Sequence, residues 1–223
     1  MDFFEVVVRF FQEGGAFMFP IAVVLAIGLA IAIERFFFLS FSKSVNKRAF
    51  KQMEPLLNKH DYSGVLSFAS NDKAPISRII GAGMARLNHS QRREDIEYAM
   101  EEGLMETTPR LEKRTAYLAT LANISTLLGL LGTIIGLIAA FSAVATADPS
   151  EKASLLSQSI SVAMNTTAFG LIAAIPLLAF HSVLQTKTTE IIDSMEMAGV
   201  KCLNALIARN DLNTQSRSTD ENR

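Results

Sequence analysis

The sequence predicts an all-α membrane protein with three transmembrane helices and long helical extensions on the cytoplasmic side. Residues 16–33, 116–147 and 153–186 contain no Asp, Glu, Lys or Arg. A helix of about 20 apolar residues crosses a hydrocarbon core of about 30 Å. Charged residues make up 19% of the 223 residues, below the roughly 25% usual in soluble domains, and the mean hydropathy is +0.27.

The first predicted span occupies residues 15–40, and residues 1–14 are expected to form an amphipathic helix in the membrane interface. The far end of the span carries Glu34 and Arg35 followed by three phenylalanines, which are residue types that anchor a helix at the interface. Basic residues outnumber acidic ones after this span but not before it. The positive-inside rule therefore places the N-terminus outside the cytoplasm.

Residues 41–115 are predicted to form a cytoplasmic helical domain, because they are rich in helix formers and nearly balanced in charge. Pro55, Gly64 and Pro75 are expected to interrupt its helices. Pro109 is expected to kink or locally break the helix that leads into the second span.

The second predicted span covers residues 116–147. The polar break that follows, at 148–152, is short enough to be a tight turn on the outer side of the membrane. The third span, at 153–186, should therefore return antiparallel to the second. Residues 187–209 are predicted to continue the third helix into the cytoplasm, because apolar residues form one stripe there. The polar end, 210–223, is predicted to be disordered.

Small residues follow one face of the second span. Gly129, Gly132 and Gly136 recur at the three- and four-residue steps that share a helical face, and Gly170 is assigned the same packing role on the third span. Within lipid, small residues at such spacing mark a helix-packing surface. The two spans are therefore expected to approach each other closely.

Polar but uncharged residues accompany these glycines: Thr133, Asn165, Thr166 and Thr167. Threonine hydroxyls can bond back to their own helix, and an asparagine can join two helices as readily as it can contact an ion. The two spans hold no acid or base at bilayer depth, whereas ion relays commonly use a buried carboxylate. If ions move along this polar wall, a second protein must supply that carboxylate.

Other functional classes have little support in the sequence. The net charge of −1 gives no basic excess for nucleic acid. No nucleophile with a base, no metal-ligand cluster and no nucleotide-binding loop is visible, so an enzyme is not predicted. The single cysteine, Cys202, is interpreted as a small packing residue in an amphipathic helix.

Two segments resemble the MotA/TolQ/ExbB proton-channel family, in particular its ExbB/TolQ-like branch. The second span contains LLGLLGTIIGLIAAF at residues 127–141, similar to the family's GLxGTVxGI pattern. The third span contains TTAFGLIAAIP at residues 166–176, similar to the family's ATAxGLxAAIP pattern. The order of one span, a cytoplasmic domain and two further spans also agrees with the family.

The resemblance implies a homopentamer in the inner membrane of a Gram-negative bacterium, built around a single-span partner of the ExbD/TolR kind. The membrane Asp of that partner would meet a threonine belt to which Thr133 and Thr167 contribute. Passage of H⁺ would drive relative rotation and mechanical work on the cell envelope, such as energising outer-membrane transport. No cofactor is implied beyond the transported ion.

Two residues depart from the pattern of the family: Val162 stands where the branch carries Glu, and Thr126 stands where it carries Pro. Because a hard cation prefers several oxygen ligands, we also consider the hypothesis that Na⁺ replaces H⁺, with Thr133, Thr166 and Thr167 as ligands. An alternative from another class is a non-conducting scaffold that oligomerises and anchors a partner. A scaffold would use the glycine face without needing the hydroxyls.

Overall fold

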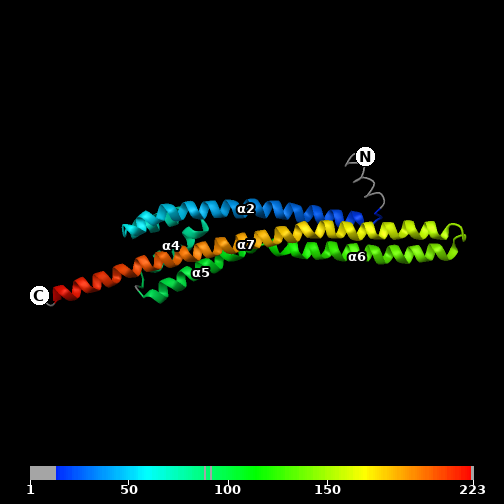
Figure 1. Ribbon diagram of the computed structural model, residues 1–223. Coiled ribbons are helices and arrows are strands. Elements are labelled where there is room, and N and C mark those ends of the chain that lie inside the picture. Colours follow the sequence, from blue (N-terminus) through cyan, green and yellow to red (C-terminus); the bar gives the residue numbers. More distant parts are fainter. Residues whose placement is uncertain (1–13, 88, 91, 222–223) are drawn as a thin grey trace. The chain divides into compact units, whose positions relative to one another are not determined.

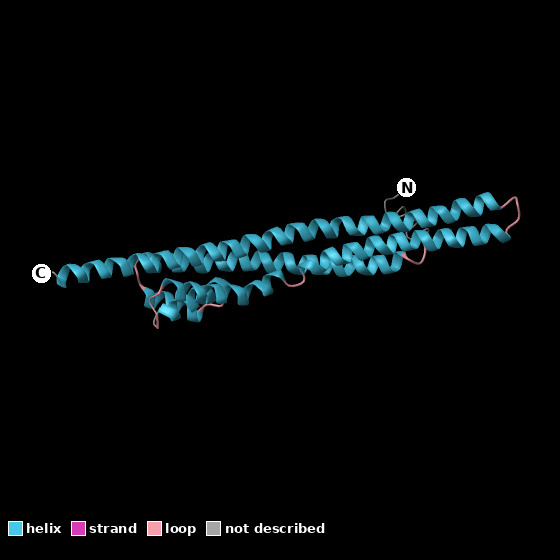
Figure 2. Ribbon diagram, turned by 90° about the horizontal axis from the view of Figure 1, so that it is seen from below, coloured by secondary structure: helices cyan, strands magenta, loops and turns pink. Residues whose placement is uncertain are grey.

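The computed structural model is almost entirely helical and describes residues 14–87, 89–90 and 92–221. Its described helices, shown in Figure 1, are α2 (Met18–Asn58), α3 (Tyr62–Asn71), α4 (Pro75–Leu87), α5 (Arg93–Glu112), α6 (Thr115–Thr146) and α7 (Lys152–Glu221). Short loops join the helices, and no strand occurs in the described part (Figure 2). The predicted interfacial helix at 1–14 lies outside the described residues, apart from Gly14.

Three stretches of the described chain are long and apolar enough, by length and composition, to cross a membrane. They lie within Met18–Asn58, Arg93–Thr146 and Lys152–Ile207. The predicted fold class, an all-α membrane protein with three spanning helices, is therefore confirmed. Only 22%, 17% and 33% of the respective apolar windows are buried within the chain. Most of this apolar surface is left to contact lipid or other chains.

The chain divides into two compact units. The membrane unit comprises Met1–Arg35 and Arg114–Leu184, and the second unit comprises Phe36–Lys113 and Gln185–Arg223. Both α2 and α7 contribute to each unit, because each helix runs through the division without interruption. The membrane unit contains the predicted functional residues.

Within the membrane unit, α6 and α7 come close enough for their backbones to touch. A Cβ at Gly170 would lie 2.7 Å from the backbone oxygen of Ser125 and 3.0 Å from the Cα of Gly129. A Cβ at Gly136 would lie 3.0 Å from the Cβ of Ala163. Only residues without a large side chain allow this approach, which is the packing mode that small residues permit in membranes.

The first span, in α2, packs against α7 through a small apolar cluster. Met18 and Ile21 of α2 are buried together with Phe169 and Ala173 of α7. Further along, a Cβ at Gly28 would lie 2.5 Å from a terminal methyl of Leu177. The third span is therefore the helix that contacts both of the others.

The second unit is held by apolar contacts among its helices. Buried side chains of α4 and α5 include Ile79, Ile80 and Met100, each at most 5% exposed. The α7 stripe is also buried, and it consists of Ile191, Met195, Ala198, Cys202 and Leu206. The stripe therefore packs inside the second unit. One of its residues, Met195, also accepts a hydrogen bond through its Sδ from the Nδ2 of Asn46 at 3.4 Å.

Cys202 has the environment expected for a packing residue. Its side chain is fully buried, and burial raises the pKa of its thiol to about 12. The thiol therefore stays protonated at neutral pH and is a poor nucleophile.

Two helix boundaries differ from the sequence expectations. Helix α2 continues through Pro55 to Asn58. Pro109 lies inside α5 without ending it, because its carbonyl still accepts the backbone N–H of Lys113 at 3.0 Å. The chain turns instead at Arg114, which has a positive φ of 68°.

Helix α7 extends into the stretch 210–223, for which disorder stays a prediction. Helix α7 continues to Glu221. Residues 200–221 contain neither Gly nor Pro, so the local sequence offers no residue that would break a helix already extended from the membrane unit.

The α6–α7 crossing predicts that Gly170→Ala destabilises the protein by about 1–3 kcal/mol, because the added methyl meets backbone atoms that cannot rotate away. Gly199→Ala is the matched control on the same helix, since the nearest atoms to its Cβ are 4.0 Å away. Thermal melting of the detergent-solubilised protein, followed by circular dichroism, measures both. Equal melting temperatures for Gly170→Ala and the wild type would contradict the close crossing.

Candidate functional site

Two of the predicted threonines meet across the α6–α7 crossing. The hydroxyls of Thr133 on α6 and Thr167 on α7 are joined by a hydrogen bond. The Thr167 Oγ1 donates to the backbone oxygen of Gly129 at 2.9 Å, and the Thr133 Oγ1 lies 3.3 Å from the backbone oxygens of Gly129 and Ala163. We call this group, the two hydroxyls with the Gly129 and Ala163 carbonyls, the threonine site.

Glycine is required at the centre of the threonine site. A Cβ on Gly129 would lie 3.3 Å from the Cα of Thr167 and 3.2 Å from the Cα of Gly170. Its absence lets the Thr167 hydroxyl reach a carbonyl on the neighbouring helix. The packing glycines and the threonines thus depend on each other, because the close backbone approach at the glycines makes the hydrogen bonds between the two helices possible.

The local alternative, in which each hydroxyl bonds back to its own helix, describes only part of the geometry. Thr133 has such a contact with Gly129, and Thr166 has one with Val162 at 3.0 Å. Thr167 donates to the other helix instead. Both Thr133 and Thr167 are half-buried in the single chain, so each keeps some surface for a further contact.

Thr166 is placed differently from its neighbour. It is 2% exposed, and its Oγ1 lies 2.6 Å from the backbone oxygen of Gly14. A Cβ on Gly132 would lie 2.4 Å from the Thr166 methyl. Asn165 is half-buried and makes no hydrogen bond with the other described residues. The Thr166 hydroxyl therefore has other partners than the Thr133–Thr167 pair, and the three hydroxyls as sodium ligands stay a prediction.

Sequence reasoning did not identify two parts of this region. The first is the Gly14 carbonyl, whose contact with Thr166 joins residues far apart in the chain. The second is the Ser125 hydroxyl, whose fully buried Oγ has no hydrogen-bond partner among the described residues. No periodicity marks either feature, because both depend on which backbone atoms lie opposite.

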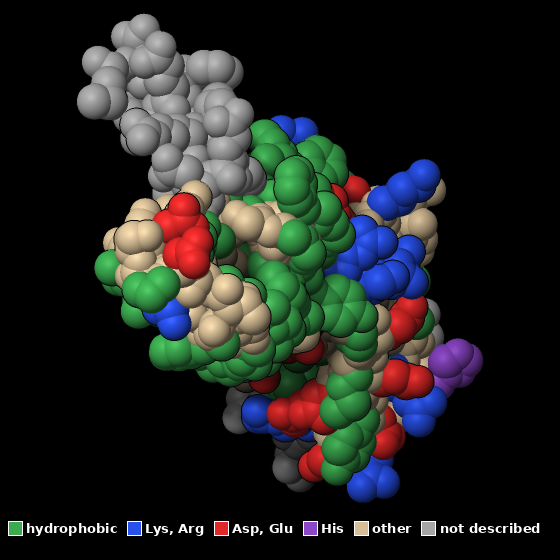
Figure 3. All heavy atoms as spheres, turned by 90° about the vertical axis from the view of Figure 1, so that its right-hand side faces the viewer, with side chains coloured by type: hydrophobic (Ala, Val, Ile, Leu, Met, Phe, Trp, Pro, Cys, Tyr) green, Lys and Arg blue, Asp and Glu red, His purple; other side chains and the backbone are tan. Residues whose placement is uncertain are grey.

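The surroundings of the threonine site are apolar and uncharged. Residues 116–147 and 153–186 hold no Asp, Glu, Lys or Arg, so the charged residues of the membrane unit that the structure describes lie outside these two stretches. At one end, Arg114 contacts Glu34 at 3.3 Å. In the view toward the α6–α7 connection, a few charged side chains stand at the tip and hydrophobic side chains cover the adjoining flank (Figure 3).

These features define a multi-span helical membrane protein whose second and third spans enclose an uncharged polar site. The chain belongs to the MotA/TolQ/ExbB proton channel family, whose model matches residues 71–197. The matched range contains the whole threonine site. Membership makes the chain a membrane ion-channel subunit.

Several relatives carry the ExbB name. The chain is 27% identical over 202 residues to an ExbB homologue of Methanothermobacter thermautotrophicus, covering 88% of this chain and 69% of that protein. It is 29% identical over 171 residues to the biopolymer transport protein exbB1 of Vibrio cholerae, covering 75% and 74%. It is 31% identical over 176 residues to the biopolymer transport protein ExbB of Salmonella typhimurium, covering 70% of each. These likenesses place the chain in the ExbB-like branch.

The contact between Thr166 and Gly14 predicts that Thr166→Val loosens the start of the first span. Valine keeps the shape but removes the donor, and we expect a loss of about 1 kcal/mol. Thr166→Ser retains the donor and serves as the control. Hydrogen–deuterium exchange of residues 14–20 should be faster in the valine variant alone. Equal exchange in all three proteins would contradict the role of this hydrogen bond.

Proposed function

We propose that this chain is an ion-conducting motor subunit that converts ion-motive force into mechanical work on the cell envelope. The observation that carries the proposal is the threonine site, a hydrogen-bonded polar group between two uncharged spanning helices. Thr133 and Thr167 line the ion pathway in this proposal. Asn165, which precedes Thr167 by two residues on α7, is assigned to the same pathway. Thr166 joins the first span to the third.

A partner supplies the negative charge. A bare H⁺ or cation is costly in hydrocarbon without a counter-charge, and the spans around the threonine site carry none. We assign this charge to the membrane Asp of a single-span partner of the ExbD/TolR kind. The half-buried hydroxyls of Thr133 and Thr167 leave surface for such an approach.

Several copies of the chain surround that partner, in a pentamer according to the family resemblance. At least two thirds of each apolar window is unburied in the single chain, which leaves a large surface for contacts between copies and with lipid. The N-terminus is proposed to face the periplasm, following the excess of basic residues after the first span. The proposed location is the inner membrane of a Gram-negative bacterium, and the proposed task is energising outer-membrane transport.

A second candidate function, a non-conducting scaffold, is supported by the same glycine crossing. A scaffold needs Gly129 and Gly170 for packing but makes no use of a Thr133–Thr167 pair. Dissipating the ion gradient separates the two functions, because a scaffold keeps its activity under an uncoupler.

The ion pathway predicts that Thr133→Val or Thr167→Val abolishes ion-driven work while expression and assembly persist. Losing a hydrogen bond to a charged group costs about 1.5–3 kcal/mol, so we expect activity to fall by about 10- to 100-fold. Ion flux through proteoliposomes that contain the complete complex with its partner measures the effect.

Thr126→Val is the matched control for these two variants. Thr126 lies on α6 like Thr133, is exposed, and donates only to its own helix, to Ala122 at 3.2 Å. It should leave ion flux unchanged. Wild-type flux in both Thr133→Val and Thr167→Val would remove the basis of the ion-pathway assignment.

The choice between H⁺ and Na⁺ has its own test. Because the Thr166 hydroxyl contacts Gly14 and not the Thr133–Thr167 pair, we propose H⁺ as the ion and keep Na⁺ as the competing hypothesis. Activity of the complex in sodium-free buffer at a fixed proton-motive force should equal that in sodium buffer. A loss of activity that returns with added Na⁺ would instead establish sodium.

A further inference from the structure

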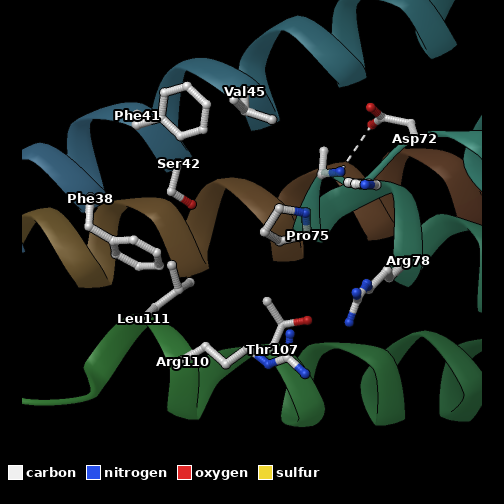
Figure 4. A pocket seen from close by; sticks show the side chains of 12 residues that line it. Phe38, Phe41, Ser42, Val45, Asp72, Pro75, Arg78, Thr107, Arg110 and Leu111 are labelled. Carbon is white, nitrogen blue, oxygen red and sulfur yellow. Dashed lines mark hydrogen bonds between the residues drawn. The ribbon is translucent and has the colours of Figure 1, made fainter.

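The second unit contains a cavity of about 470 Å³ between α2, the α3–α4 connection and α5. Figure 4 shows its side chains. Much of the wall is apolar and is formed by Phe38, Phe41, Val45, Pro75 and Leu111. A cavity of this size accommodates a substantial organic group, and its wall favours a hydrocarbon one.

One polar side chain inside this wall is left without a partner. Ser42 lines the cavity and is 7% exposed, and its Oγ makes no hydrogen bond with any described residue. Figure 4 shows this hydroxyl directed from α2 into the space that faces α5. A buried hydroxyl without a hydrogen bond is costly, so a ligand that offers an acceptor oxygen here would relieve that cost.

Cationic side chains line the same cavity: Lys73, Arg78 and Arg110. Arg78 and Arg110 share a single carboxylate, that of Glu106, at 3.7 and 3.9 Å. Asp72, which also lines the cavity, accepts hydrogen bonds from the Ser77 hydroxyl at 2.5 Å and the Ala74 N–H at 3.2 Å. The lining therefore has more cationic than anionic groups, and Arg78 and Arg110 are each paired only loosely with Glu106.

The cavity lies close along the chain to two spanning segments. Phe38 and Phe41 lie about two turns or less beyond Arg35 on the continuous helix α2. Arg110 and Leu111 belong to the last turn of α5, directly before α6 begins at Thr115. Positions next to the ends of membrane spans are where basic pockets meet lipid headgroups.

We propose that this cavity binds an anionic phospholipid drawn from the adjoining leaflet of the bilayer. The phosphate lies at Arg78 and Arg110, an acyl chain follows the wall formed by Phe38 and Leu111, and the Ser42 hydroxyl donates to an ester oxygen. Inorganic phosphate alone would use the arginines but would leave the apolar wall and Ser42 unmatched. The proposal does not depend on ion conduction.

Lipid retention by the full-length protein tests this site. The protein is reconstituted with equal amounts of phosphatidylglycerol and phosphatidylcholine, extracted in mild detergent, and analysed by native mass spectrometry for bound lipid. One surface arginine contributes about a fivefold preference for anionic lipid, so the wild type should retain phosphatidylglycerol in at least about fivefold excess. The combined Arg78→Gln and Arg110→Gln variant should bring the ratio close to that of the bulk lipid.

Matched controls use arginines on the same two helices that do not line the cavity. The combined Arg86→Gln and Arg93→Gln variant removes one arginine from α4 and one from α5 and should retain the wild-type excess. Ser42→Leu fills the cavity while leaving its cations in place, and it should also lower the excess. Circular dichroism verifies that each variant keeps its helices.

Three results would overturn the proposal. The first is a wild type that retains the two lipids equally. The second is an excess of phosphatidylglycerol that persists in both the Arg78/Arg110 variant and Ser42→Leu, which would assign the lipid to another surface or show the cavity to be covered by a second copy of the chain. The third is complete loss of the excess on adding inorganic phosphate, which would identify a site for the free anion.

Discussion

The close backbone approach of α6 and α7 is the constraint on which the membrane unit depends. At Gly170 the two helices leave no room for a methyl group, and at Gly129 a methyl group would fit only tightly. This close approach brings the Thr167 hydroxyl to a carbonyl on the neighbouring helix. Within hydrocarbon, a polar group must find its partner inside the protein. The same few atoms therefore form the helix contact and the hydrogen bonds of the threonine site. A substitution that separates the helices would also break these hydrogen bonds.

This constraint explains why the proposed ion pathway needs a second protein. The threonine site is neutral and its hydroxyls are engaged with one another and with carbonyls, so the chain by itself is stable without an ion. Placing a carboxylate permanently among these atoms would carry a large cost in the unpartnered chain. A counter-charge that arrives on another polypeptide avoids that cost until the complex forms.

Much of this arrangement could be predicted from the sequence, because helical periodicity states which residues share a face. The spacing of Gly129, Gly132 and Gly136 indicated the packing surface, and the uncharged stretches indicated the spans. Periodicity does not state which atoms lie opposite. The pairing of Thr166 with Gly14 and the unpartnered Ser125 hydroxyl depend on backbone positions that no local pattern encodes. Composition also does not fix where α7 ends, because a polar stretch without Gly or Pro can extend a helix that has already formed, and α7 continues to Glu221.

The second unit uses charge in a different way from the membrane unit. Arg78 and Arg110 are half exposed and meet Glu106 at distances near 4 Å, and exposed ion pairs of this kind contribute only about 0–1 kcal/mol to stability. Their contribution to folding is therefore small, and exchanging Glu106 for another anion costs little. The apolar wall beside them is part of the fold, since Leu111 is 1% exposed. An apolar wall beside weakly paired cations is suited to a phospholipid. The wall can contact the acyl chain of the lipid, while the cations remain available for its headgroup.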